Sequence, residues 1–280
     1  MRVISADKIS KVVARLCISA NIDLRRDVFL QLEAACRREK NKRTKDILQA
    51  IIQNARVAAR EGLAICQDTG LPCVFVEIGQ EVRVAGDLKA AIIRGVASGY
   101  KKGYLRSSMV KDPLLRDRPG YLPPVIHIDL VKGSKLKLTV LPKGFGCENK
   151  ARLQMFKPTA KINEIKKFVI EVIKDAGPDA CPPYIVGVGI GGTADYACFL
   201  AKKALLKKIT NYQLLITNYL SKLEQDLLKE INKLNIGPMG LGGRTTALAV
   251  NILTYPTHIA GLPVAVNISC HALRSATKTV

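Results

Sequence analysis

The chain has 280 residues, of which 48% are hydrophobic and 24% charged. This composition is ordinary for a globular protein with a sizeable core, and it excludes a disordered tail or a collagen-like fibre. The 44 basic and 23 acidic residues give a net charge of +21. Such a charge attracts nucleic acid, an acidic partner or small acidic substrates, unless it only covers solvated helix faces. An aromatic content of 5% with no Trp disfavours base stacking and hence nucleic acid.

Two further patterns bear on the cellular compartment. The sequence has neither an apolar run of about 18 residues nor the apolar segment of a signal peptide, so we expect a cytoplasmic protein without a membrane span. There are eight cysteines and no C-x-x-C pair. We therefore expect reduced thiols, exclude zinc ribbons and thioredoxin-type sites, and expect any metal site to gather cysteines from distant segments.

The first 60 residues predict a helical N-terminal region. Apolar residues at helical spacing occur from Val3 to Leu16, then from Val28 to Cys36 after Asp23 as a candidate N-cap, then from Ile47 to Ala59. The third of these helices is expected to end near Gly62.

The remaining pattern alternates strands and helices. In chain order it predicts a strand over 74–78 ending at Gly79, a helix over 86–102, a β-hairpin of strands 125–131 and 136–141 turning at 132–134, a helix over 162–175, a strand over 184–190, helices over 194–208 and 212–234, and strands over 247–253 and 264–268. The expected fold class is mixed α/β, with β-sheet segments flanked by helices after the helical N-terminal region. With no repeat or linker, we expect a single domain over residues 1–280, of which 1–60 are the helical part.

Three segments each allow a structural and a functional interpretation. Cys66, Gln67 and Asp68 stand consecutively before Thr69-Gly70, either as a turn with a buried thiol or as a site. The glycine-rich stretch 142–150 is an anion cradle between two lysines or a plain loop. Cys181 before two prolines is a rigidly placed metal ligand or a structural cysteine.

Two more segments are rich in glycine. Residues 187–192 satisfy G-x-G-x-x-G, but lysines stand where a dinucleotide-binding fold needs an acidic residue, so we reject that interpretation. From Gly240 to His271, Arg244 is a candidate carboxylate-binding residue. His258 is a candidate site residue or a core histidine.

Together these segments resemble the α subunits of the two-subunit class I fumarate hydratases and of the related L-tartrate dehydratases. The resemblance rests on ICQDTG at 65–70, FVEIG at 75–79, YLRSSMVKDPL at 104–114, PKGFGCENK at 142–150, ACPP at 180–183, GVGIGGT at 187–193, GLGGRTTALAV at 240–250 and THIAGLPVAVNISCHA at 257–272. It covers nearly the whole chain, and eight motifs in family order are far more specific than any one of them.

The resemblance implies a [4Fe–4S] cluster bound by Cys66, Cys181 and Cys270. Three ligands for four irons leave one iron open, which would serve as a Lewis acid rather than as an electron carrier. It assigns no role to the other five cysteines, of which Cys147 is a candidate near-site thiol and the rest (Cys17, Cys36, Cys73 and Cys198) are expected to be core or surface thiols.

The resemblance also implies an activity, the reversible hydration of fumarate to L-malate, a step of the tricarboxylic acid cycle. By analogy, Arg106 and the backbone N–H of Gly146 would contact the dicarboxylate substrate. Gln67 would position substrate, and Asp68 would deliver or take the proton at the hydroxyl. His258 would reach the active site, which a neighbouring subunit could share.

The sequence leaves two rival functions and one expected partner. L-tartrate dehydratase is the alternative within the enzyme class, because it would use the same cluster and differ in how the pocket treats one more hydroxyl. A basic nucleic-acid-binding or scaffold protein is the alternative from another class, which explains the charge but not the cysteine segments. Since the chain ends soon after Cys270, the resemblance implies a β subunit and a heterotetramer of the α₂β₂ type.

Overall fold

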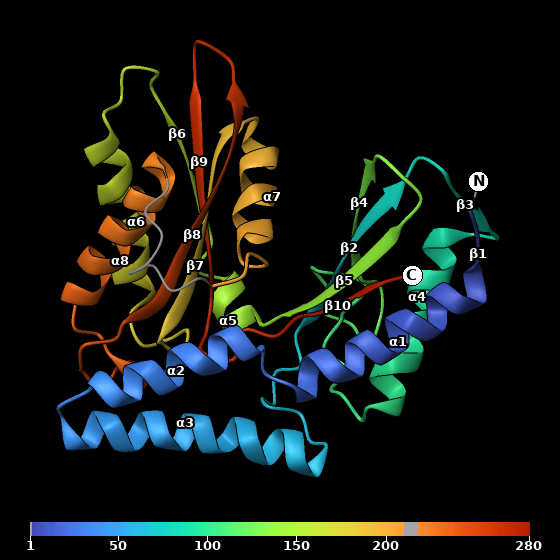
Figure 1. The fold of residues 1–280 in the computed structure, drawn as a ribbon, viewed down its shortest axis with the longest axis horizontal. Coiled ribbons are helices and arrows are strands. Elements are labelled where there is room, and N and C mark those ends of the chain that lie inside the picture. The colour runs from blue at the N-terminus through green and yellow to red at the C-terminus, as the bar shows by residue number, and fades with distance from the viewer. Residues whose placement is uncertain (1, 210–217) are drawn as a thin grey trace. The chain divides into compact units, whose positions relative to one another are not determined.

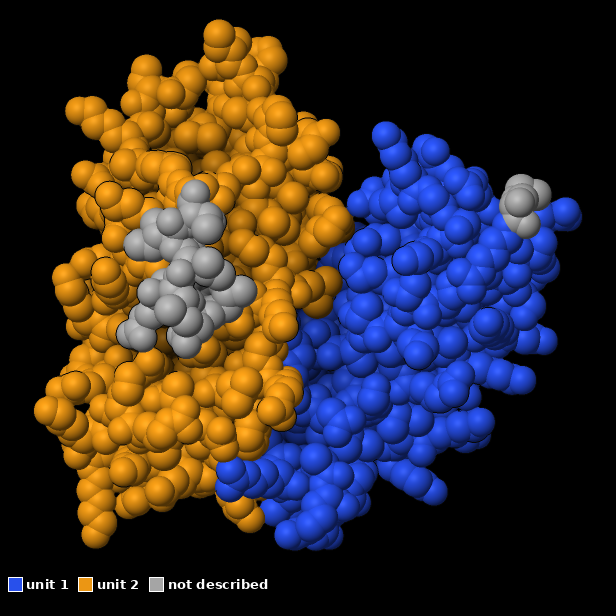
Figure 2. Space-filling view, viewed as in Figure 1, with its two compact units in different colours: residues 1–25, 54–145, 274–280 blue, residues 26–53, 146–273 orange. Residues whose placement is uncertain are grey.

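The computed structural model describes residues 2–209 and 218–280, and its mixed α/β architecture confirms the predicted fold class. The described chain falls into two compact units (Figure 2). Unit 1 comprises residues 1–25, 54–145 and 274–280, and unit 2 comprises residues 26–53 and 146–273. The chain passes between them at 25/26, 53/54, 145/146 and 273/274. A single domain over the whole chain stays a prediction.

Unit 1 is built on a four-stranded sheet with the order β10-β5-β2-β4 (Figure 1). Its strands are β2 (Leu71–Gly79), β4 (Val125–Val131), β5 (Leu136–Lys143) and β10 (Ala276–Thr279), and β1 (Arg2–Ser5) pairs separately with β3 (Val82–Ala85). Helices α1 (Ala6–Ile22) and α4 (Leu88–Lys102) pack closely on each other. A Cβ at Gly99 would lie 2.6 Å from the Ala14 carbonyl oxygen, so only glycine allows this approach.

The predicted hairpin of 125–131 and 136–141 is wrong, although both strands are present. Strand β2 lies between them, parallel to β4 and antiparallel to β5. The connection between β4 and β5 crosses the end of β2, where the Gly79 amide donates to the Lys135 carbonyl at 2.9 Å. A Cβ at Gly79 would stand 2.1 Å from the Gly133 oxygen. The short glycine turn is typical of a hairpin, but the apolar β2 strand pairs along both edges.

Unit 2 is a three-layer arrangement around a sheet of order β6-β9-β7-β8 (Figure 1). The strands are β6 (Arg152–Phe156), β7 (Tyr184–Gly192), β8 (Ala247–Thr257) and β9 (Leu262–Ser269). Helices α6 (Ile162–Ala176) and α8 (Tyr219–Lys233) cover one face, and α7 (Ala194–Ala204) covers the other. The unit also holds α2 (Arg26–Arg38), the first part of α3 (Lys42–Glu61), most of the short α5 (Phe145–Glu148) and the 3₁₀ turn at Pro238–Gly240.

The glycines of the G-x-G-x-x-G stretch have a packing role in unit 2. They lie within β7, and a Cβ at Gly187 or Gly189 would stand 2.1 Å from a carbonyl oxygen of α7. Those oxygens belong to Ala201 and Ala197, so the glycines let the helix lie directly on the strand. This close approach accounts for the motif without a bound dinucleotide.

Most other predicted elements are present. The first helix spans Ala6–Ile22 instead of Val3 to Leu16, because Arg2–Ser5 form β1. Asp23 ends α1, its amide donating to Ser19, instead of beginning α2. The short strands β1, β3, β6 and β10 were not predicted, and residues 212–217 of a predicted helix lie outside the described residues. Cys17, Cys36 and Cys73 are buried and Cys198 is exposed, as expected. Across residues 2–209 and 218–280, no helix has the length and apolar character needed to cross a membrane.

Candidate functional site

The first candidate ligand lies on an irregular turn of unit 1, residues 65–70, which we call the Cys66 turn. Its first residue is fixed on both sides: the Ile65 amide donates to the Asn21 carbonyl, and Asn54 Nδ2 donates to the Ile65 carbonyl, both at 2.9 Å. At its end the Tyr100 hydroxyl donates to the carbonyls of Thr69 (2.9 Å) and Gly70 (3.1 Å). The turn is therefore held by buried groups around it.

Burial keeps the Tyr100 hydroxyl in its donor form. Desolvation raises the pKa of Tyr100 far above its ordinary value. The phenol thus stays protonated at any pH at which the protein would be studied.

Gly70 has φ +72°, and a Cβ there would meet the Pro142 carbonyl carbon at 2.7 Å, so glycine is required.

Asp68 ties the Cys66 turn to the glycine-rich loop. Its Oδ1 accepts from the Gly70 amide at 2.9 Å, and its Oδ2 accepts from the Phe145 amide at 3.0 Å. The loop therefore does bind an anion, and that anion is an internal carboxylate. Lys150, proposed as a flank of an anion cradle, forms an ion pair with Asp179 at 2.8 Å.

Three predicted site residues gather around this turn. Cys66 is partly exposed, with its Sγ 3.5 Å from Gln67 Oε1, and the Gln67 side chain is exposed. The Arg106 amide donates to Thr69 Oγ1 at 3.0 Å, and Thr69 Oγ1 donates back to the Arg106 carbonyl at 3.3 Å. Arg106 is thereby anchored through its backbone while its side chain is exposed.

The second and third candidate ligands lie on adjoining segments of unit 2. The Cys181 carbonyl accepts from the His271 amide at 3.4 Å, and His271 Nδ1 lies 3.1 Å from the same oxygen. Because a carbonyl can only accept, Nδ1 carries the proton in this contact. His271 directly follows Cys270, so this contact brings the two cysteine segments together. Cys181 has φ +55°, a conformation unusual outside glycine, and both thiols are partly exposed.

Cys147, in the glycine-rich stretch 142–150, packs against the segment that contains Cys181. Cys147 Sγ donates to the Ala180 carbonyl at 3.3 Å and is buried, so this thiol lies beside the residue that precedes Cys181. Gly146 is exposed just before it. The next residue, Glu148, accepts from Lys202 Nζ at 2.6 Å and from Asn267 Nδ2 at 3.2 Å. These bonds join α5 to α7 and to β9.

His258 lies at the exposed tip between β8 and β9, so it is not a core histidine. Its Nδ1 accepts from the Ala260 amide at 3.2 Å, which leaves the proton of the neutral ring on Nε2. It lines a depression of about 420 Å³ with Tyr196 and Tyr255, whose ring centroids are 4.7 Å apart.

Arg244 is fixed through its backbone, and its role as a carboxylate-binding residue stays a prediction. Its side chain is exposed, and its backbone amide donates to Glu39 Oε2 at 2.9 Å. Burial acts to raise the pKa of Glu39, but hydrogen bonds from the amides of Asn41, Arg244 and Lys40 lower the pKa below its ordinary value. The carboxylate thus holds two loops together within unit 2.

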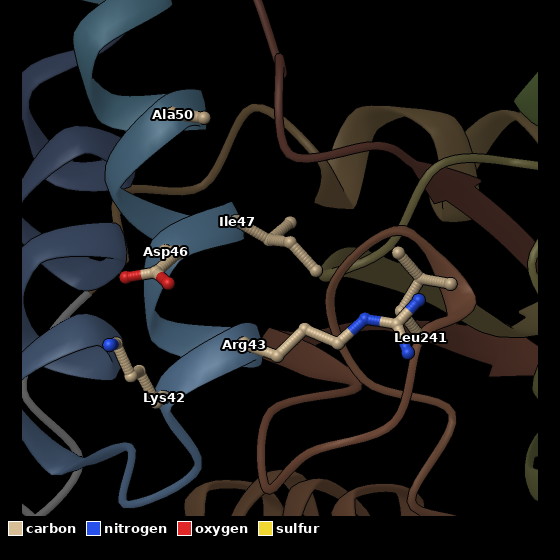
Figure 3. Close-up of a pocket in the computed structure, with 6 residues that line it drawn as sticks. All are labelled: Lys42, Arg43, Asp46, Ile47, Ala50 and Leu241. Atoms are coloured by element: carbon tan, nitrogen blue, oxygen red, sulfur yellow. The ribbon is translucent and has the colours of Figure 1, made fainter.

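A separate groove in unit 2 contains no predicted site residue. In Figure 3, Arg43 and Ile47 extend from α3 toward Leu241. Its lining residues are Lys42, Arg43, Asp46, Ile47, Ala50 and Leu241. We do not assign it to the candidate site.

The candidate ligands are divided between the units. Unit 1 holds Cys66, and unit 2 holds Cys181 and Cys270. Among the residues that the structure describes, no group of three or more His, Cys, Asp or Glu side chains is arranged to hold a metal ion.

Sequence reasoning missed the residues that support these segments. Asn21, Tyr100 and Glu148 are each a polar residue within or beside an apolar stretch, and Arg274 ends the mostly apolar segment that follows β9. A single polar or charged residue in such a stretch is the signal that could have indicated them.

Comparisons with known proteins agree on one family. A family model described as fumarate hydratase (Fumerase) matches residues 10–279. The putative L(+)-tartrate dehydratase subunit alpha of Methanocaldococcus jannaschii is 42% identical over 283 residues, covering 98% of each chain. The L(+)-tartrate dehydratase subunit alpha of Escherichia coli K12 is 28% identical over 280 residues, covering 99% of this chain and 92% of the relative. Matches of this length favour an enzyme over the basic scaffold alternative.

Proposed function

This chain belongs to the fumarate hydratase (Fumerase) family of hydro-lyases, and from that premise we propose that it is the α subunit of an L-tartrate dehydratase. The observation that carries the proposal is full-length similarity to relatives named as that subunit, one of them 42% identical. Hydration of fumarate to L-malate, the activity first expected, becomes the second candidate, supported by the description of the family model.

We propose that Cys66, Cys181 and Cys270 bind a [4Fe–4S] cluster. The donor set fits, because thiolates are the usual protein ligands of iron–sulfur clusters. The partly exposed Cys181 and the segment of Cys270 adjoin in unit 2 through His271, and Cys66 is partly exposed on a turn that buried groups hold. When bound, such a cluster would supply a Lewis-acidic iron.

The protein residues would bind and orient a small dicarboxylate. Arg106 has an exposed guanidinium and a backbone anchored to Thr69, a combination that suits binding of a carboxylate. Gln67, next to Cys66 and exposed, would contact the substrate beside the cluster. The exposed Gly146 offers a backbone N–H, and His258 would act from the β8–β9 tip.

Asp68 would have two roles, one structural and one chemical. Its carboxylate accepts two backbone N–H groups, so it fixes the turn and the loop. The same carboxylate would exchange the proton at the substrate hydroxyl. A proton on either oxygen would compete with one of these hydrogen bonds, which would couple proton transfer to a loosening of the loop.

We propose that a β subunit completes the enzyme in an α₂β₂ assembly, because the matched relatives are named as alpha subunits. The charge of +21 would then complement an acidic partner or attract a dianionic substrate. Association of the subunits that weakens with rising salt supports the first explanation.

The test of the substrate is a rate comparison under anaerobic conditions, using the chain co-expressed with its β partner. L-Tartrate, L-malate and fumarate are the substrates. We expect kcat/KM for L-tartrate to exceed that for L-malate by at least about tenfold, because polar groups that bind the second hydroxyl would be left unpaired by malate. A preference for malate and fumarate would overturn the L-tartrate assignment in favour of the second candidate.

The test of the cluster is the iron and acid-labile sulfide content after anaerobic reconstitution of the full chain. We expect brown protein that bleaches in air. Replacing Cys66, Cys181 or Cys270 by serine should abolish or strongly reduce the iron content, whereas Cys198→Ser, at an exposed thiol of α7, should leave it unchanged. Iron content that is indifferent to all four substitutions would refute the ligand assignment.

A further inference from the structure

Arg274 is a buried cation that no described function uses. It is 3% exposed, lies in unit 1, and stands four positions after Cys270 in the sequence. Its Nη1 donates to Asn21 Oδ1 at 3.2 Å, and its Nη2 donates to the Asp68 carbonyl at 2.8 Å. Among the described residues no carboxylate forms an ion pair with it, and its Nε has no hydrogen-bond partner.

A buried guanidinium without a carboxylate is costly, so its place in the fold needs an explanation. Its two bonds go to groups that fix the Cys66 turn. Asn21, itself fully buried, accepts Arg274 through its side chain and accepts the Ile65 amide through its carbonyl. Its Nδ2 donates to the Cys17 carbonyl at 2.9 Å, which fixes the amide group on α1.

The two anchored positions lie on either side of the reactive residues. Ile65 is held by the Asn21 carbonyl, and Asp68 is held by Arg274. Cys66 and Gln67 stand between these two anchored positions. Cys66 Sγ contacts Gln67 Oε1, and this contact does not involve the anchors. The anchors therefore set the backbone of this dipeptide and leave its side chains available.

We propose that Arg274 is a positioning residue, which pre-forms the Cys66 turn so that Cys66 and Gln67 are presented before cluster or substrate binds. The importance of this role rests on the proposed function. Two donors of a rigid planar fork reach two separate acceptors, one on α1 and one on the turn. Lysine has the same charge but a single donor centre, so it cannot hold both acceptors in the same way.

The first test measures amide hydrogen exchange in the full chain without cluster. We expect the bonded amides of Ile65 and Gly70 to exchange at least about tenfold faster in Arg274→Met and in Arg274→Lys than in the unmodified chain, equivalent to about 1.4 kcal/mol of lost protection. Arg83→Met, at an exposed arginine of β3, is the matched control and should leave both rates unchanged.

A second variant keeps the test decisive if Arg274→Met does not fold. Asn21→Ser retains an oxygen acceptor on a shorter side chain, so the bond to Arg274 should be lost while the main chain of α1 is kept. The same two amides should then lose protection. Unchanged exchange at Ile65 and Gly70 in either folded variant would overturn the proposal, and full rescue by lysine would also overturn it, because charge alone would then suffice.

The second test uses reconstituted holoenzyme with its partner. At equal iron content, we expect Arg274→Lys to alter the electron paramagnetic resonance line shape of the reduced cluster and to raise KM for the dicarboxylate at least about threefold. A residue that only sets overall stability would change the loaded fraction but not the line shape. Unchanged spectrum and KM would overturn the positioning role. The exchange test needs neither cluster nor turnover, so it stands apart from failure of the proposed function.

Discussion

Asp68→Asn separates the structural role of this carboxylate from its proposed chemical role. In the folded protein its two oxygens each accept a backbone N–H, from Gly70 at 2.9 Å and from Phe145 at 3.0 Å. Asparagine supplies only one acceptor oxygen, and its NH₂ group would face the second amide as donor against donor. One of the two bonds must therefore be lost.

The magnitude follows from the type of bond. A hydrogen bond to a charged group contributes about 1.5–3 kcal/mol. We expect Asp68→Asn to lower the free energy of unfolding by about that amount, which corresponds to a fall in Tm of roughly 3–12 °C for a protein of this size class. If Asp68 also transfers the proton at the hydroxyl, kcat should fall by a further factor of about 10²–10⁴, because an amide cannot replace a general acid.

The two effects are read by separate assays. Urea unfolding of the chain without cluster gives the stability change, and kcat per bound cluster in the complete enzyme gives the chemical change. Asp175→Asn, at an exposed carboxylate of α6, is the control and should change neither. An unfolding midpoint equal to that of the parent would refute the two hydrogen bonds, and unchanged kcat would refute the proton-transfer role.

Three other substitutions or reactions test the fold. Gly189→Ala should destabilise the protein by at least about 1–3 kcal/mol in urea unfolding, because its Cβ would lie 2.1 Å from the Ala197 oxygen; Gly120→Ala, with open space around it, should stay within about 0.5 kcal/mol, and equal midpoints would contradict the close packing of α7. The pKa of Glu39 is lowered from its ordinary value of 4.5, so its contribution to stability is fully present above that pH and is lost as the pH falls through the lower folded value. Glu39→Gln should therefore be less stable at neutral pH by a margin that shrinks on acidification, and a pH-independent margin would argue against this. Maleimide at neutral pH should label the exposed Cys198 in the folded apo chain but not Cys17, whose pKa burial raises to about 12, and labelling of Cys17 without prior unfolding would disprove its burial.

The sequence predicted elements well where a periodic pattern was long. Helices α4 and α6 each span 15 residues and lie close to their expected bounds. Strands β3 and β10 have four residues each, which is too short for alternation to stand out. The pairing of β2 between β4 and β5 was missed, because strand order depends on contacts between segments and not on local pattern.

The residues of the candidate site likewise include some that the sequence could identify and some that it could not. The sequence could identify Cys66, Cys181 and Cys270 as candidate ligands, because the motifs that contain them resemble those of a known family. The buried anchors could not, because an asparagine in α1 and an arginine near the C-terminus acquire their meaning only when the fold brings them to one turn. Arg106 lies between these two cases, because the family resemblance implied a contact with substrate and the structure added the backbone anchor at Thr69.

The order of the units along the chain has a consequence for biosynthesis. Strand β10, at residues 276–279, forms the edge beside β5, and the Thr277 and Thr139 hydroxyls lie 2.9 Å apart. Because this strand follows residues 146–273 of unit 2 in the sequence, the sheet of unit 1 stays one strand short until that segment of unit 2 has been synthesised. Arg274, which holds the Cys66 turn, follows the same segment. The sheet of unit 1 should therefore be completed only after synthesis of unit 2, and a chain truncated after residue 273 should leave an open sheet edge for chaperones or proteases to recognise.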